Sequence, residues 1–103
     1  MVPLINLLKD TNKQVRRDAA FALSKINAPE ALDALIEALR DEFVGVRYFA
    51  VIALSKLGNH KALPELEWIE KHDNASTVEE IDSGTMQEAA AFAILKIKQQ
   101  ISL

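Results

Sequence analysis

Hydrophobic residues recur at helical spacing along most of the chain, and the whole pattern returns after 31 residues. Residues 15–27 and residues 46–58 match position by position, and both contain the string Ala-Leu-Ser-Lys, at 22–25 and at 53–56. A weaker copy lies at 93–97. A single amphipathic helix cannot bury its apolar face alone, so a fixed period of this length predicts a solenoid of stacked helical units.

Each repeat unit is predicted to hold two helices joined by a short turn. In the first unit, one helix is expected from Pro3 to Lys9, because proline suits the first helical turn. Thr11 and Gln14 have the spacing of a capping box and are expected to start the second helix, which ends near residue 26. The stripe predicted to be buried in that second helix is Val15, Ala19, Ala22, Leu23 and Ile26, with Ala20 near its edge.

The second and third units carry their own start and stop signals. The second unit begins near Ala28, with Pro29 in its first turn. Gly58 is expected at its end as a left-handed C-terminal cap, and Asn27 occupies the equivalent position in the first unit. The third unit begins at Asn59, which is an expected N-cap.

An insertion is predicted within the third unit. The interval from Lys56 to Lys96 is 40 residues, whereas the equivalent interval between the first two units is 31 residues. Thr85 and Glu88 have capping-box spacing and are expected to start the last helix. The chain is thus interpreted as one all-α domain, 1–103, with units at about 1–27, 28–58 and 59–100 and an insertion within 73–84.

Composition narrows the classes of function. The chain has 103 residues, half of them hydrophobic, a formal net charge of −3 and a pI near 5.3. This mildly acidic balance argues against nucleic acid as a partner, because phosphate binding requires clustered lysine and arginine. The chain has no cysteine, which excludes disulfides and thiolate catalysis. No apolar run has membrane-spanning length and the N-terminus lacks a signal-peptide pattern, so no membrane partner and a cytoplasmic location are expected.

The sequence shows no pattern typical of catalysis or of cofactor binding. The two histidines, His60 and His72, are 12 residues apart and are interpreted as surface residues rather than metal ligands. There is no glycine-rich phosphate loop, and no acid/base pair can be assigned. We therefore expect a protein without enzymatic activity, cofactor or metal.

The repeated positions resemble HEAT-like repeats of the type found in phycobilisome lyases. The residues that carry the resemblance are Val15-Arg16, Ala19-Ala20, Ala22-Leu23 and Ile26-Asn27, then Val46-Arg47, Ala50-Val51, Ala53-Leu54 and Leu57-Gly58. The resemblance implies a right-handed superhelix of antiparallel helix pairs, with the second helix of each pair lining a concave face.

The resemblance also implies an internal ladder of charged side chains. Arg16 and Arg47 are expected to join this ladder with aspartates such as Asp10 and Asp41. Gln87 takes the place of the arginine in the third unit, so the ladder is expected to stop there.

Carrying the family pattern over also predicts a set of side chains that face the concave surface. Phe21, Ile52 and Phe92 are equivalent positions that packing does not require to be apolar, and a lysine flanks each of them. An apolar stripe rimmed by charge is typical of a protein-binding groove, although ordinary packing between adjacent helices is an alternative. Tyr48 and Phe49 are adjacent, so at least one should be partly exposed. The predicted face consists of Arg17, Phe21, Lys25, Tyr48, Phe49, Ile52, Lys56, Glu88, Phe92 and Lys96.

Trp68 is a separate candidate, because it aligns with two polar residues, Asn6 and Glu37. Two interpretations stay open for it. The indole anchors a partner protein, or it packs beneath the inserted segment.

Three classes of function follow from these observations. The leading interpretation is a non-catalytic scaffold that binds another protein or a peptide in the concave groove. The resemblance implies an alternative, a subunit or relative of a phycobilin lyase or a factor that handles phycobiliproteins. Nucleic-acid processing is disfavoured by the acidic charge and the few arginines on the predicted face. The strongly apolar first helix also leaves open a homodimer formed through the ends of the repeat stack.

Overall fold

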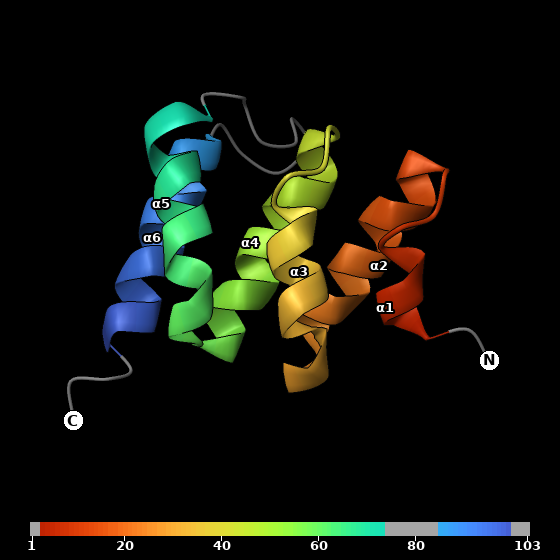
Figure 1. Ribbon diagram of the computed structural model, residues 1–103, viewed down its shortest axis with the longest axis horizontal. Helices are drawn as coiled ribbons and strands as arrows, with labels where there is room; N and C mark the ends of the chain where they lie inside the picture. Colours follow the sequence, from red (N-terminus) through yellow and green to blue (C-terminus); the bar gives the residue numbers. More distant parts are fainter. Residues whose placement is uncertain (1–2, 74–84, 100–103) are drawn as a thin grey trace.

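The computed structural model describes residues 3–73 and 85–99, which form six α-helices and two short 3-10 turns. The helices pair in sequence order along the longest axis of the molecule, with α3 packed over α4 and α5 over α6 (Figure 1). The all-α repeat architecture predicted from the 31-residue period is confirmed. In order, the elements are α1 (Leu4–Leu7), α2 (Lys13–Lys25), η1 (Pro29–Ala31), α3 (Leu32–Ala38), α4 (Val44–Leu57), η2 (His60–Ala62), α5 (Leu63–His72) and α6 (Met86–Gln99).

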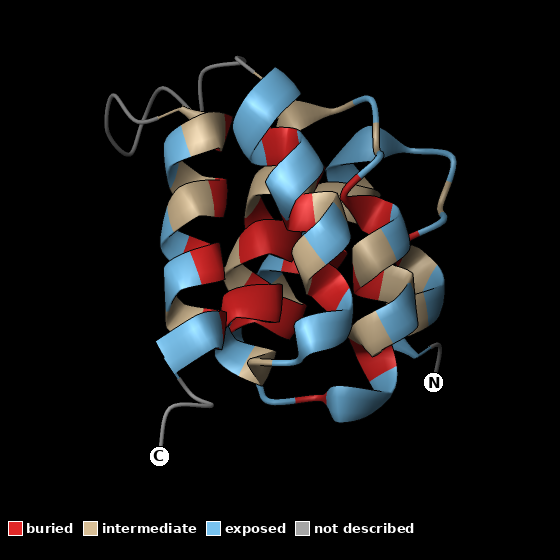
Figure 2. Cartoon of the chain, turned by 60° about the vertical axis from the view of Figure 1, so that its left-hand side comes forward, coloured by how far each residue is buried: buried red, intermediate tan, exposed pale blue. Residues whose placement is uncertain are grey.

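The second helices form the spine of the molecule. α2 packs against α4, and α4 packs against α6. Ala20, Ala50 and Ala90 are fully buried on these helices, and their small side chains let the helix axes approach closely. Buried residues gather where the helices face one another, while exposed residues lie on the outer sides of the helices (Figure 2).

The helix ends show which capping signals the chain uses. The prediction for the start of α2 is wrong by one residue: Asn12, not Thr11, is the N-cap, and its side chain accepts hydrogen bonds from the backbone N–H groups of Gln14 and Val15. The capping box at the start of α6 is confirmed. Thr85 Oγ1 accepts from the Glu88 N–H at 3.1 Å, and Glu88 Oε1 accepts from the Thr85 N–H at 3.0 Å.

Gly58 ends α4 as the sequence predicts, with a left-handed φ of 68°. The equivalent end of α2 is different. Ile26 is the C-cap there, in extended conformation, and among the described residues no residue other than Gly58 has positive φ, so Asn27 does not form a left-handed cap. The extended backbone turns Ile26 outward, which leaves it 50% exposed rather than in the predicted buried stripe.

The third unit keeps its core contacts but changes its outer surface. Leu66 and Ile69 of α5 are buried, and Asn59 is an N-cap as expected. The predicted insertion, apart from Asp73, lies outside the described residues. Within the described ranges, 3–73 and 85–99, no helix is long and apolar enough to cross a membrane.

Candidate functional site

Two arginine–aspartate pairs join a second helix to the segment that follows the first helix of the next unit. Arg16 Nε donates to Asp41 Oδ2 at 2.8 Å, and Arg47 Nε donates to Asp73 Oδ2 at 2.7 Å. Each arginine also donates from Nη1 to the backbone carbonyl of its own unit, at Asp10 for Arg16 and at Asp41 for Arg47. The ladder is therefore present, but each side-chain pair links one unit to the next rather than closing within a unit. The hydrogen bond to Asp41 raises the pKa of Arg16 above its ordinary value, so this guanidinium stays charged.

A groove of about 470 Å³ lies between α4 and α6. These two helices pack directly against each other. The floor of the groove includes Val51 and Ala93, which are buried core residues. Six side chains that line the groove were among those predicted for the concave face: Tyr48, Ile52, Lys56, Glu88, Phe92 and Lys96.

The equivalent apolar positions differ in how far they reach into solvent. Phe92 is 62% exposed and Phe21 is 44% exposed, whereas Ile52 and Tyr48 are half-buried. Exposed aromatic side chains of this kind are the usual energetic anchors of protein interfaces. Phe21 and Phe92 are thus not buried core, whereas Tyr48 and Ile52 pack partly against the core, which was the alternative left open by the sequence.

Phe49 requires a correction, because the sequence placed it on the predicted face and the structure buries it. Its ring is only 8% exposed and makes edge contacts with Phe21, at 5.1 Å between centroids, and with Tyr48, at 5.2 Å. The expectation that at least one of the adjacent Tyr48 and Phe49 is partly exposed is confirmed by Tyr48. Phe49 therefore supports the exposed aromatic side chains from below instead of offering surface of its own.

Arg17 is held against a neighbouring helix. Gly45 in the first turn of α4 is buried, and a Cβ at that position would lie 2.9 Å from Arg17 Cδ. Arg17 Nε lies 3.8 Å from a carboxylate oxygen of Asp18. The stem of Arg17 thus fills the space that the missing side chain of Gly45 leaves, and it does not line the groove.

The lysines of the predicted face lie beside the apolar row. Lys25 Nζ lies 5.1 Å from the centroid of the Phe21 ring, and Lys96 Nζ lies 5.9 Å from that of Phe92. Lys56 follows Ile52 at the same four-residue spacing. None of these three lysines is within ion-pair distance of a carboxylate in the part of the chain that the structure describes. Their ammonium groups therefore face solvent or an aromatic ring.

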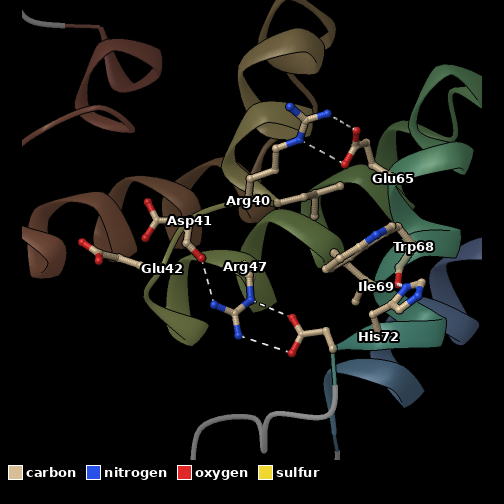
Figure 3. Close-up of a pocket in the computed structure, with 10 residues that line it drawn as sticks. Arg40, Asp41, Glu42, Arg47, Glu65, Trp68, Ile69 and His72 are labelled. Atoms are coloured by element: carbon tan, nitrogen blue, oxygen red, sulfur yellow. Dashed lines mark hydrogen bonds and ion pairs between the residues drawn. The ribbon is translucent and has the colours of Figure 1, made fainter.

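A second pocket, of about 550 Å³, lies between α3 and α5, the first helices of the second and third units (Figure 3). Trp68 is 57% exposed and stacks on His72 at 4.7 Å between ring centroids. Trp68 is therefore not buried, and its expected contact with the insertion involves residues outside the described ranges. The remaining polar walls are ion pairs, Arg40 with Glu65 and the Arg47–Asp73 rung of the ladder.

The sequence singled out Trp68 but not this pocket. Arg40 follows the end of α3 and pairs with Glu65 of α5, whereas the residues one period earlier are Lys9 and Ala34, which cannot form the same pair. The hydrogen bond to Glu65 raises the pKa of Arg40. The pair could therefore not be found by comparing equivalent positions of the repeat.

Groups of three or more histidine, cysteine, aspartate or glutamate side chains able to hold a metal ion do not occur among residues 3–73 and 85–99. His60 and His72 are both exposed.

Comparison with known proteins identifies the repeat. Residues 1–81 match the family model described as HEAT repeats. No curated protein matches the sequence significantly. The matched range ends before α6, so one wall of the groove lies beyond it.

Proposed function

The chain belongs to the HEAT repeat family, and from this premise we propose that it is a non-catalytic scaffold that binds another protein or a peptide in the groove between α4 and α6. HEAT repeats generally mediate protein interaction, and the family is generally non-enzymatic. The repeat itself is a scaffold, so the site must be argued from particular side chains.

One observation carries the proposal: equivalent positions of the three second helices all hold an apolar side chain that the fold leaves accessible. Phe92 is 62% exposed, although burial of a phenylalanine contributes about 1.5–3 kcal/mol to a fold. The fold does not obtain this contribution from Phe92, which lies at the rim of a groove next to half-buried Tyr48 and Ile52. A partner that covers this row would gain the contribution on binding.

The experiment compares capture of partners by matched variants. The wild type, an Ile52→Ala/Phe92→Ala variant and a Leu95→Ala variant are each immobilised and exposed to lysate of the source organism. Leu95 is a suitable control because it lies on the same helix and is 55% exposed, yet it does not line the groove. Circular dichroism establishes that all three are folded.

The expected result is a protein retained by the wild type and by Leu95→Ala but lost by Ile52→Ala/Phe92→Ala. Equal retention by all three folded proteins contradicts the use of the groove. Unfolding of the double variant alone would show that these side chains serve the fold, and it would equally contradict the proposal.

A second copy of the chain is a further candidate partner. Phe92 and Leu95 give α6, the last described helix, an exposed apolar surface. Sedimentation velocity over a range of concentrations tests this candidate, and a monomer at every concentration contradicts it.

The resemblance to phycobilisome-lyase repeats supports a narrower alternative, in which the groove holds a bilin. A bilin is an open-chain tetrapyrrole with carboxylate side chains, and the groove combines apolar walls with Lys56 and Lys96. A shifted absorption band on mixing with a bilin, abolished in Ile52→Ala/Phe92→Ala, supports this alternative. An unchanged spectrum contradicts it.

A further inference from the structure

The charge of the groove differs in sign from the charge of the chain. The ionisable residues that line the groove are Lys56, Lys96 and Glu88, which sum to +1, whereas the whole chain carries −3. Glu88 is also engaged, because its Oε1 accepts a hydrogen bond from the Thr85 N–H in the capping box. The charges available to a bound partner are therefore the two ammonium groups.

We infer that the groove recognises an acidic amphipathic helix of a partner protein, with apolar side chains on Ile52 and Phe92 and carboxylates on Lys56 and Lys96. This inference rests on the proposed protein-binding function and specifies the chemistry of the partner. Lys25, beside Phe21 on α2, extends the same arrangement by one helix.

The spacing of the lysines supports this occupant. In each second helix the lysine follows the apolar residue by four positions, so both lie on one face and are about one turn apart. Packed helices lie about 8–10 Å apart, and α2, α4 and α6 pack in that order. The result is an apolar row and a parallel cationic row, both running across the helices.

A helix lying along these rows can match both of them. Residues seven positions apart in a helix are separated by about 10.5 Å along the axis and lie on nearly the same face, which matches the interval between neighbouring second helices. Carboxylates at every seventh residue would meet the cationic row, and apolar residues on the adjoining face of the same helix would meet Ile52 and Phe92.

The present contacts of the lysines leave them available. Lys25 and Lys96 rest near aromatic rings, and a cation–π contact at an exposed site is a weak interaction. A carboxylate delivered beside Lys96 can form a charge-assisted hydrogen bond without first breaking an existing ion pair. The guanidinium groups that line the Trp68 pocket differ, since Arg40 is paired with Glu65 and Arg47 with Asp73.

The test uses synthetic peptides rather than an unidentified ligand. A labelled helical peptide of about 16 residues, long enough to cross two helix intervals, carries leucine on one face and glutamate at every seventh position. One twin has glutamine in place of each glutamate, which keeps the helix propensity nearly the same, and another has lysine. Fluorescence anisotropy gives the affinity of each peptide at low and at higher salt.

The glutamate peptide is expected to bind most tightly, the glutamine peptide at least about tenfold more weakly, and the lysine peptide most weakly of the three. The affinity for the glutamate peptide is expected to fall as the salt concentration rises. Lys56→Glu/Lys96→Glu reverses this order. Lys71→Glu/Lys98→Glu, which changes the net charge by the same amount at exposed lysines outside the groove, keeps it. Circular dichroism controls for folding of both variants.

If the wild type binds the three peptides equally and the Phe92→Ala variant binds none of them, this inference is overturned while the proposed function stays intact. Absence of any binding by the glutamate peptide at low salt would also overturn it. Failure of the proposed function is a different result, namely retention of every captured lysate protein by Ile52→Ala/Phe92→Ala.

Discussion

The groove between α4 and α6 and the pocket beside Trp68 have similar volumes, about 470 and 550 Å³, and each presents a ring that is more than half exposed. They differ in the state of their charges. In the groove, Lys56 and Lys96 have no carboxylate partner among the described residues. In the Trp68 pocket, Arg40 is paired with Glu65 and Arg47 with Asp73.

Hollow volume and an exposed aromatic ring are common to both surfaces, so the choice between them rests on this difference in charge. A charge that is already paired inside the fold must lose that partner before it can bind another, and its removal is expected to harm stability rather than recognition. A charge that lacks a partner can contribute to binding directly. We therefore propose the groove, rather than the Trp68 pocket with its paired guanidinium groups, as the recognition surface.

The largest expected effect is a loss of stability on changing Arg47, which lines the Trp68 pocket. Arg47→Met keeps the aliphatic stem but removes the hydrogen bonds to Asp73 and to the Asp41 carbonyl. The Arg47 side chain is only 16% exposed, so a loss of about 3 kcal/mol in the free energy of unfolding is expected. Urea denaturation measures it.

Arg40→Met is the matched control for this prediction. Arg40 lines the same pocket and pairs with Glu65, but its side chain is 72% exposed, and exposed pairs contribute little. A clearly smaller loss than for Arg47→Met is expected. Equal losses in the two variants would contradict the distinction between structural and exposed pairs.

The next effect is on binding in the groove. Phe92→Ala is expected to weaken binding of the glutamate peptide at least about tenfold, because the exposed Phe92 ring lines the groove. Removal of a central aromatic anchor has an effect of this size. Phe21→Ala is expected to weaken binding less, since Phe21 does not line the groove itself. Anisotropy titrations measure both variants, and the reverse order would place the binding surface between α2 and α4 instead.

A smaller effect distinguishes two roles of Thr85, namely capping of α6 and contact with a bound peptide. Thr85 lines the groove, but its Oγ1 accepts from the Glu88 N–H at the start of α6. Thr85→Ala is expected to lower the free energy of unfolding by about 1 kcal/mol without changing the affinity for the peptide. Thr85→Ser, which keeps the hydroxyl, should restore most of the stability. A loss of affinity that Thr85→Ser does not restore would make Thr85 a contact residue.

Much of the fold and part of the groove could be predicted because the repeat makes equivalent positions visible. Comparison of Phe21, Ile52 and Phe92 identified a row that no single helix would reveal. The capping box at Thr85 and the glycine cap at Gly58 were also predictable, since both depend on local backbone chemistry.

The wrong predictions concern choices that neighbouring elements decide. α4 is apolar on almost every side, so its sequence does not specify which of two adjacent aromatic side chains points inward, and packing against α2 buries Phe49. Ile26 has a helical spacing, but the helix ends at Lys25 and the extended backbone exposes the next side chain. The sequence leaves open which aspartate each arginine of the ladder pairs with, because the pairing of Arg16 with Asp41 depends on how one unit stacks on the next.

The smallest expected effect concerns Trp68, and it tests the comparison most directly. Trp68→Ala removes an exposed ring whose described ring contact is the stack on His72, so the free energy of unfolding is expected to change by about 0.5 kcal/mol. The affinity for the glutamate peptide is expected to stay unchanged, because Trp68 does not line the groove. The same titration with Phe92→Ala provides the reference. If Trp68→Ala weakens binding of the glutamate peptide as much as Phe92→Ala does, then an exposed ring, and not an unpaired charge beside it, determines where the peptide binds.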